Sequence, residues 1–253
     1  MRLSTEKGQF LGFKSLMRKL VMRLATITLV ALLAGCGSGG RAPDQTTFTF
    51  DFAHGAQGWT TGFSDYPVGQ EQFFQLDSGL RALPPPLDQS GTGILLSGIN
   101  HSDDLFMFLT GHLTRLKPDQ TYSFKFLVEF ATNAPSGCAG VGGPPGEGVW
   151  VKVGASSIQP QPKAVAGSYS MNIDKGNQEQ GGTDAIVVGN VANGLTDCFN
   201  LVYAMKTLQN TQDTFTARTD SQGTIWAIVG TDSGFEGETA LYYAKIIVTV
   251  QPS

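Results

Sequence analysis

The clearest pattern in this chain is an alternation of apolar and polar residues between Thr121 and Phe130. Side chains that recur at every second position share one face of an extended strand, whereas a helix would scatter them around its circumference. A shorter run, from Thr47 to Phe52, alternates in the same way. Both segments are therefore predicted to be half-buried β-strands. The residues expected to face the core are Tyr122, Phe124, Phe126, Val128 and Phe130, with Leu127 as an apolar exception on the other face, and Phe48, Phe50 and Phe52.

Further segments have the β-branched and aromatic composition of strands and are separated by glycine- and proline-rich turn signals. Only Leu201–Leu208 is expected to form a short helix. About ten to twelve strands predict an all-β fold, a two-sheet antiparallel sandwich with jelly-roll-like topology. The additional strand predictions are Gln72–Leu76, Gly93–Ser97, Leu105–Leu109, Val149–Val153, Tyr169–Ile173, Ala185–Val191, Thr214–Arg218, Thr224–Val229 and Leu241–Val250.

The N-terminal segment has a different character. Basic residues, among them Lys14 and Arg23, precede an apolar run from Leu24 to Leu33. This run is about ten residues long, and a helix needs roughly 20 to span a bilayer. It ends in Leu33-Ala34-Gly35-Cys36, which resembles the lipobox of bacterial lipoproteins. A cleaved secretory signal and an uncleaved N-terminal anchor are the alternatives.

The resemblance implies that residues 1–35 are a signal peptide and that Cys36 becomes an acylated N-terminus, since several acyl chains together form a stable membrane anchor. Residues 36–46 are then a lipidated tether and residues 47–253 a single β-sandwich domain. Because Met17 and Met22 each stand before a basic residue and give signals of ordinary length, residues 1–16 are expected to be a mis-assigned start with no role in the fold. By resemblance to Gram-negative lipoproteins, Gly37 favours the outer membrane of the cell envelope.

The charge of the chain excludes some partners. Residues 1–35 hold six of the 17 Lys and Arg residues but one of the 21 Asp and Glu residues, so the remaining chain has a formal net charge of −9. Nucleic-acid binding needs a basic surface, and so does electrostatic docking on anionic lipid. The composition is compatible with binding cations or neutral sugars.

With Cys36 assigned to lipid, Cys138 and Cys198 remain. Two cysteines in an oxidising envelope compartment are expected to pair in a disulfide, with two separate buried thiols as the alternative. Cys138 lies in the glycine-rich stretch Gly137–Gly146. This stretch is not a phosphate-binding loop, because no Gly-Lys-Ser/Thr follows and its prolines lack amide donors. A disulfide-pinned surface loop close to Glu147 and Trp150 is predicted.

The stretch from Thr231 to Thr239, followed by Leu241–Val248, resembles the end of a carbohydrate-binding or galactose-binding-like jelly roll. In such folds the last strand pairs near the first. The resemblance implies saccharide binding, for which aromatic faces beside amides and carboxylates are suited. Trp59 has the alternative of a core position, since aromatic residues dominate core burial. The candidate ligand-binding residues are Trp59, Asp65, Tyr66, Asn100, His101 and Trp150.

The densest polar cluster is Asn100–Asp104, which contains Asp103 and Asp104. Carboxylate, amide and hydroxyl oxygens suit Ca²⁺, which takes six to eight oxygen ligands. Adjacent strand residues face opposite ways, so both aspartates could bind one ion only from a loop; a turn with aspartate caps is the alternative. By resemblance to carbohydrate modules that hold a structural calcium, Asp51 and Glu238 are two further candidate ligands.

Support for catalysis is weak. The sequence has no Gly-x-Ser-x-Gly elbow and no His-Glu-x-x-His helix. Glycoside hydrolysis needs only two carboxylates, which an acidic chain can supply. Three functions are therefore considered: a lipid-anchored saccharide-binding module, a structural or interaction protein of the envelope, and a hydrolase. The first predicts a site lined with exposed aromatics and amides, and the third predicts two facing carboxylates, one with a raised pKa.

Overall fold

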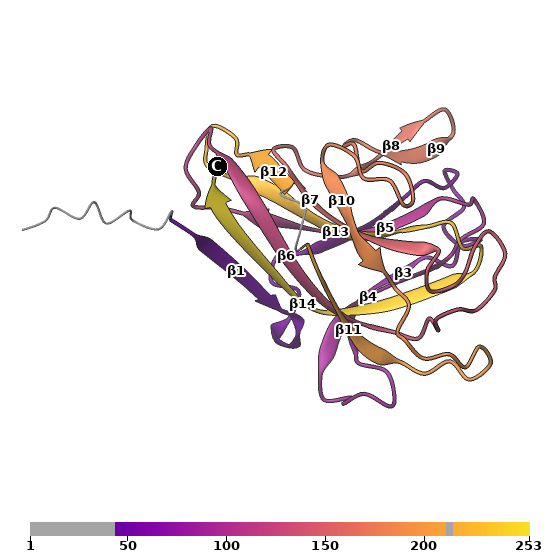
Figure 1. Ribbon diagram of the computed structural model, residues 1–253. Helices are drawn as coiled ribbons and strands as arrows, with labels where there is room; N and C mark the ends of the chain where they lie inside the picture. The colour runs from indigo at the N-terminus through magenta and orange to yellow at the C-terminus, as the bar shows by residue number, and fades with distance from the viewer. Residues whose placement is uncertain (1–43, 211–214) are drawn as a thin grey trace, which may run out of the picture. The chain divides into compact units, whose positions relative to one another are not determined.

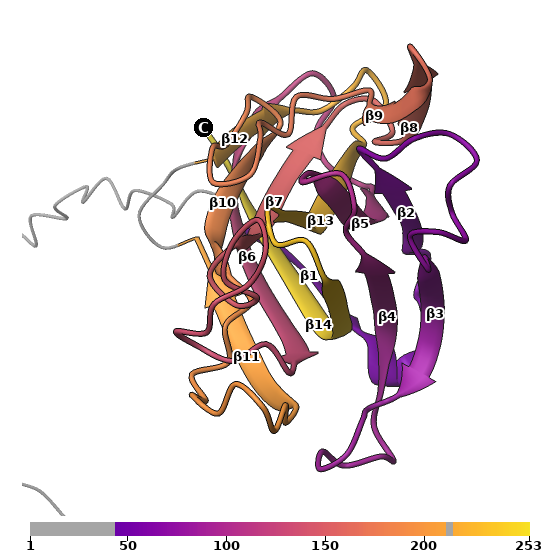
Figure 2. The ribbon, with the colours of Figure 1, turned by 90° about the vertical axis from the view of Figure 1, so that its right-hand side faces the viewer.

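A computed structural model describes residues 44–210 and 215–253 of the 253-residue chain. The described residues form two large antiparallel sheets and one small hairpin (Figures 1 and 2). The seven-stranded sheet contains β1 (Thr46–Asp51), β3 (Asp77–Ala82), β4 (Thr92–Ile99), β6 (Thr121–Thr132), β11 (Ala204–Gln209), β12 (Phe215–Arg218) and β14 (Glu238–Pro252). The five-stranded sheet contains β2 (Thr60–Ser64), β5 (Leu105–Leu113), β7 (Val149–Ser156), β10 (Ala185–Asn190) and β13 (Ile225–Ser233). The all-β two-sheet sandwich predicted from the alternating pattern is confirmed.

The strand order places the two ends of the domain side by side. In the seven-stranded sheet the order is β11-β6-β14-β4-β3, with β1 pairing to β14 and β12 to β6. In the five-stranded sheet it is β10-β7-β13-β5-β2. Because Thr46 lies opposite Val250, the first strand pairs with the last, as expected for a jelly-roll-like fold.

The core lies between the two sheets and follows the alternation seen in the sequence. The five predicted core residues of β6 are all buried, and Leu127 faces outward opposite Ile247 of β14. On β5, Leu105, Met107 and Leu109 belong to the main core, whereas the intervening Phe106 and Phe108 point to the outer face of the sheet.

Those outer phenylalanines are buried because another part of the chain covers them. Residues 157–184, here called the covering segment, contain the hairpin of β8 (Pro162–Val165) and β9 (Ser168–Met171). Its Ile173 packs with Phe106, Phe108 and Ile228 in a second apolar cluster outside the sandwich. Figure 2 shows the hairpin beside β2, outside the two large sheets.

Two predicted elements are wrong. Leu201–Leu208 is not a helix, since Ala204–Gln209 forms β11, which pairs with β6 along its whole length. Hydrogen bonds to a long neighbouring strand outweigh a weak local helical preference. Gln72–Leu76 is not a strand: its backbone folds into turns in which Phe74 N–H donates to Gln70 O at 2.9 Å. The pattern also missed β2, β3 and β8.

The only helical turn among the described residues is η1 (Phe52–His54). Within these same residues, no helix has the length and hydropathy needed to cross a bilayer. The predicted signal peptide, the tether as far as residue 43 and the lipidation site at Cys36 lie outside the described residues.

Candidate functional site

A cavity of about 270 Å³ opens at one end of the sandwich, beside the disulfide. We call it the end cavity. Its apolar lining includes Leu201, Phe235 and the Cys138–Cys198 bridge. Hydrogen-bonding groups come from Asn133, just after β6, and from Glu238 and Thr239 at the start of β14. The end cavity thus combines apolar surface with a few polar groups, as small-molecule sites do.

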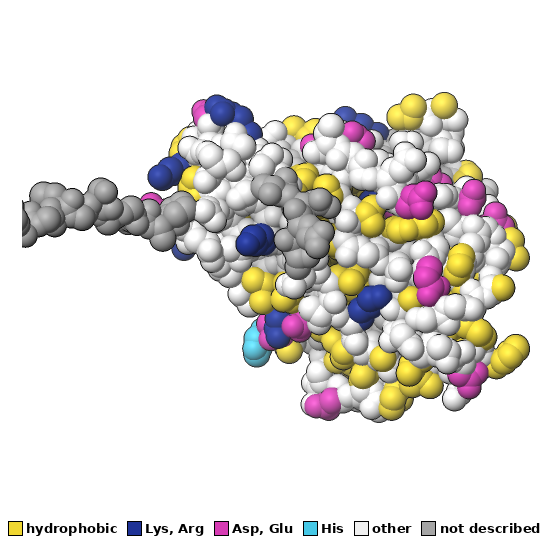
Figure 3. All heavy atoms as spheres, viewed as in Figure 1, with side chains coloured by type: hydrophobic (Ala, Val, Ile, Leu, Met, Phe, Trp, Pro, Cys, Tyr) yellow, Lys and Arg dark blue, Asp and Glu magenta, His cyan; other side chains and the backbone are white. Residues whose placement is uncertain are grey.

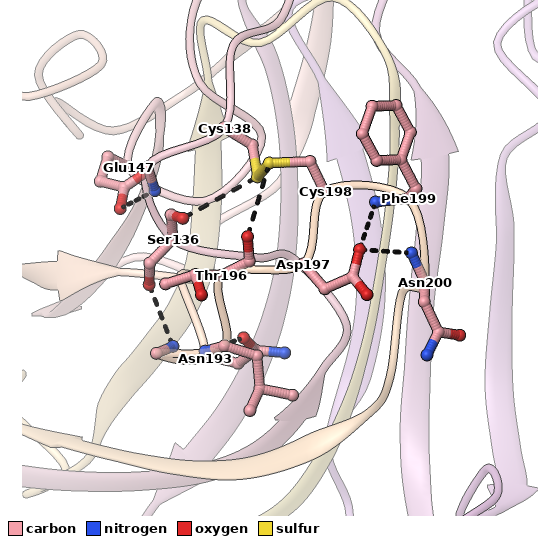
Figure 4. The surroundings of a disulfide bond; sticks show 12 residues. Ser136, Cys138, Glu147, Asn193, Thr196, Asp197, Cys198, Phe199 and Asn200 are labelled. Atoms are coloured by element: carbon pink, nitrogen blue, oxygen red, sulfur yellow. Dashed lines mark hydrogen bonds between the residues drawn. A yellow bond between two sulfur atoms is a disulfide. The ribbon is translucent and has the colours of Figure 1, made fainter.

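The loops around the end cavity are held together at several points (Figure 4). The predicted disulfide is confirmed and joins Cys138 to Cys198 with their Cα atoms 5.7 Å apart. Ser136 contributes two further links, because its N–H donates to Leu195 O at 2.7 Å and its Oγ accepts from Gly194 N–H at 3.0 Å. A site fixed in this way keeps its shape without a bound ligand, which lowers the ordering cost of binding.

An aromatic side chain is presented to solvent next to this bridge. Phe199 is 99 % exposed. The loop that carries it is ordered by Asp197, whose Oδ1 accepts from Phe199 N–H at 3.0 Å and from Asn200 N–H at 3.1 Å. In Figure 4 the Phe199 ring projects away from the disulfide. Leu195 and Leu201 on the same loop are also exposed, and Figure 3 shows hydrophobic side chains gathered on the lower part of the molecule.

A buried ion cluster lies on the outer face of the five-stranded sheet. It consists of Asp65, Asp104, Lys152, Lys175 and Asp232. Asp232 Oδ2 lies 2.8 Å from Lys152 Nζ and 2.7 Å from Lys175 Nζ, and it also accepts from Gln178 N–H at 3.0 Å. Lys152 Nζ donates as well to the carbonyls of Lys175 and Gln180, both at 2.9 Å. These contacts attach the covering segment to β7 and β13.

Burial controls the pKa values in the ion cluster. It raises the pKa of Asp104 to about 7; Lys175 opposes this shift, and the carboxylates of Asp232 and Asp65 add to it. Burial also raises the pKa of Asp65, although Lys175 opposes this shift at 3.2 Å. For Lys175, burial acts to lower the pKa, but the carboxylates of Asp232 and Asp65 outweigh it and the pKa is raised. Burial lowers the pKa of Lys152.

Asp65 and Asp104 line an open notch of about 230 Å³, together with Asp174 and Lys175. Two carboxylates with raised pKa values at one notch are the feature expected of a hydrolase. Here, however, Asp65 is paired with Lys175, and Asp104 faces Asp232 within the ion cluster. Both carboxylates therefore belong to the ion cluster as well as to the notch.

Three of the predicted ligand-binding residues are structural. Trp59 is 4 % exposed and packs edge-on against Phe50 at 5.3 Å between ring centroids, so it takes the alternative core position. Tyr66 is also a core residue. Asn100 is buried, and its amide donates to the carbonyl of Ser233 at 2.7 Å.

The remaining predicted residues are separated from the end cavity. Asp65 belongs to the ion cluster, and Trp150 lies opposite Asp232 in the five-stranded sheet. His101 is exposed and stacks on Phe73, with 4.2 Å between ring centroids. None of these residues lines the end cavity.

The four predicted calcium ligands do not converge. Asp103 is exposed, whereas Asp104 turns toward the ion cluster. Asp51 lies opposite Lys245, seven positions along β14 from Glu238, which corresponds to roughly 23 Å in an extended strand. Among the described residues, no group of three or more His, Cys, Asp or Glu side chains is placed to hold a metal ion.

The sequence carried one usable signal for the ion cluster that the interpretation passed over. Lys152 interrupts the apolar strand Val149–Val153, and a lysine within such a run needs a buried partner or a path to solvent. Asn133 stands in no motif, and Phe235 is not distinguished from its neighbours in the stretch Thr231–Thr239, because the end cavity is assembled from loops distant in the chain.

The fold and the site together define a β-sandwich with a disulfide-braced cavity at one end. No protein-family model matches the chain, and neither does any curated protein. Solved structures do match. The enzymatically active domain of tailspike protein 4 from Bacteriophage CBA120 has 12 % identity and a TM-score of 0.35, over 77 % of this chain but only 20 % of that one.

Two carbohydrate-binding modules match over more of their own length. The module TmCBM61, solved with β-1,4-galactotriose, has 9 % identity and a TM-score of 0.36, over 78 % of this chain and 92 % of that one. The C-terminal family 22 module of Clostridium thermocellum Xyn10B has 11 % identity and a TM-score of 0.37, over 81 % of this chain and 93 % of that one. At these TM-scores the likeness assigns neither a family nor a ligand.

Proposed function

We propose that this protein is a lipid-anchored binding module of the bacterial envelope that takes a saccharide in the end cavity. The observation that carries the proposal is the cavity itself: a braced hollow of about 270 Å³ with apolar walls and the polar groups of Asn133, Glu238 and Thr239. A pyranose ring has an apolar face and a rim of hydroxyls, so it matches such a lining. Sites for drug-sized ligands usually measure about 300–1,000 Å³, so the end cavity suits a single sugar ring or a chain end.

The end cavity is distant from the point at which the chain enters the domain. Chain entry at Thr46 lies opposite Val250, whereas the end cavity is lined by Glu238–Leu241. The nine positions between Leu241 and Val250 correspond to roughly 30 Å of strand. The end cavity therefore lies well away, along β14, from the point where the chain enters the domain.

A glycan array probed with the soluble fragment 37–253 tests the binding function. We expect binding that is weakened by Asn133→Ala and Glu238→Gln and retained by Phe73→Ala, a matched change at an aromatic residue that is 57 % exposed but does not line the end cavity. A repeat in EDTA tests the calcium prediction separately. An array with no binding under either condition would eliminate the saccharide proposal and favour a structural or interaction role in the envelope.

The anchor needs its own experiment, because the binding function does not depend on it. Mass spectrometry of the protein from its host should find an acylated Cys36 as the first residue. A Cys36→Ser variant should leave the membrane fraction. An intact N-terminal Met with an unmodified thiol at position 36 would refute the anchor and leave the end cavity unaffected.

A further inference from the structure

The ion cluster contains two oxygens whose hydrogen bonding is incomplete. Asp232 is fully buried, and its Oδ2 accepts from three donors while its Oδ1 has no donor. Oδ1 of Asp104 is likewise buried without a donor. A buried carboxylate oxygen with no donor is costly, so each needs a physical explanation.

The two aspartates share one face of one sheet. Asp232 lies opposite Phe106 in the β13–β5 pair, on the outer face of the sheet, and Asp104, just before β5, lines the notch on this face together with Lys175. Diagonal neighbours across a strand pair lie roughly 7–8 Å apart, a separation that two carboxyl groups can bridge when they point toward each other. A hydrogen bond between the two carboxyl groups would give both of these oxygens a partner, and it requires a proton on one of the two aspartates.

The charge count of the cluster points the same way. Asp65, Asp104 and Asp232 face two ammonium groups, Lys152 and Lys175, so the cluster carries a net charge of −1 when all five groups are ionised. One proton brings the net charge to zero. Buried clusters favour neutrality because unbalanced charge is poorly solvated there. The other carboxylate at this notch, Asp174, is exposed and has its pKa lowered by the N–H groups of Thr183 and Gly176, so it does not take up this proton.

We propose that Asp104 and Asp232 form a proton-binding site in which Asp104 donates to Asp232 Oδ1, and that loss of this proton loosens the covering segment from the five-stranded sheet. The attachment passes through the same carboxylate, since Asp232 Oδ2 holds Lys175 Nζ and Gln178 N–H. An added negative charge on Asp104 disturbs this balance of charge. This charge would lie beside Phe106, whose ring centroid is 4.9 Å from Lys175 Nζ. The pH therefore controls how tightly residues 174–180 are held against the five-stranded sheet beside Phe106.

Hydrogen exchange of residues 174–180, measured by mass spectrometry at pH 5 and pH 8 and corrected for intrinsic exchange rates, tests the proposal. Protection of these amides should be at least about tenfold lower at pH 8, because the closed state binds a proton that the open state releases. Asp104→Asn retains a donor for Asp232 Oδ1 but cannot titrate, so its protection should be high and equal at both pH values. Asp103→Asn changes the adjacent exposed carboxylate and should keep the wild-type pH dependence.

Wild-type protection that is equal at pH 5 and pH 8 would overturn the proposal, as would an Asp104→Asn variant that keeps the wild-type pH dependence. The wild-type measurement decides the matter even if a variant fails to fold. Amides of β6, which are remote from the ion cluster, report global opening and show whether any change is confined to the covering segment.

Discussion

Removing the disulfide should cost stability mainly through the unfolded chain. The bridge closes a loop of 60 residues. The loop-entropy relation then gives roughly 4 kcal/mol at 25 °C. Replacing both cysteines with serine keeps the Ser136 links to Gly194 and Leu195, and it places one hydroxyl at the exposed position 198 and one at the buried position 138. Reduced wild-type protein keeps both thiols and therefore separates the loss of the bridge from the cost of the buried hydroxyl. The Cys138→Ser/Cys198→Ser variant should therefore fold normally and unfold more easily.

Urea unfolding followed by tryptophan fluorescence measures this effect. The double variant should lose about 4 kcal/mol of unfolding free energy, and reduced wild-type protein should approach the same value. Unreduced wild-type protein is the reference. If the variant loses less than about 1 kcal/mol while reduction is shown to be complete, the loop-entropy argument is wrong for this chain, and residual contacts in the unfolded state already hold the two cysteines together.

Three further changes test the packing and charge of the sandwich. Lys152→Met removes one of the two ammonium partners of the buried Asp232 carboxylate and should lower the unfolding free energy in urea by about 3–5 kcal/mol. The control Lys245→Met, at a partly exposed ion pair, should lower it by less than about 1 kcal/mol. Equal losses in the two variants would contradict the role of burial. Gly111→Ala places a Cβ against the Trp59 ring and should lower the unfolding free energy by about 1–3 kcal/mol. An unchanged melting temperature would show that the Trp59 ring can move aside without cost. The pKa of Asp104 is raised from 3.8 to about 7, so protonated Asp104 contributes its full stabilisation below pH 4, and this contribution falls by a few kcal/mol as the pH rises to 7. The difference in unfolding free energy between wild type and Asp104→Asn should follow the same course with pH. A difference that does not change with pH would refute this titration of Asp104.

The candidate site was only partly predictable. The pairing of Cys138 with Cys198 followed from the count of cysteines, and the bridge borders the end cavity. Asn133 stands in no motif, and the pattern of the stretch Thr231–Thr239 does not distinguish Phe235 from its neighbours. The sequence allows Trp59 either a ligand-binding or a core position, and its burial shows that it occupies the core. An aromatic residue in a loop has no local signal that distinguishes these two positions.

The sequence by itself determined the strands that alternate strongly, above all β1 and β6, because a period of two is a local property that any neighbouring sheet must respect. Only the tertiary structure decided that Ala204–Gln209 is a strand, since its hydrogen bonds come from β6, more than 70 residues earlier in the chain. The same holds for the ion cluster. Lys152, Lys175 and Asp232 lie far apart in sequence, and they meet because two strands and a covering segment bury them together, where each charge requires the others.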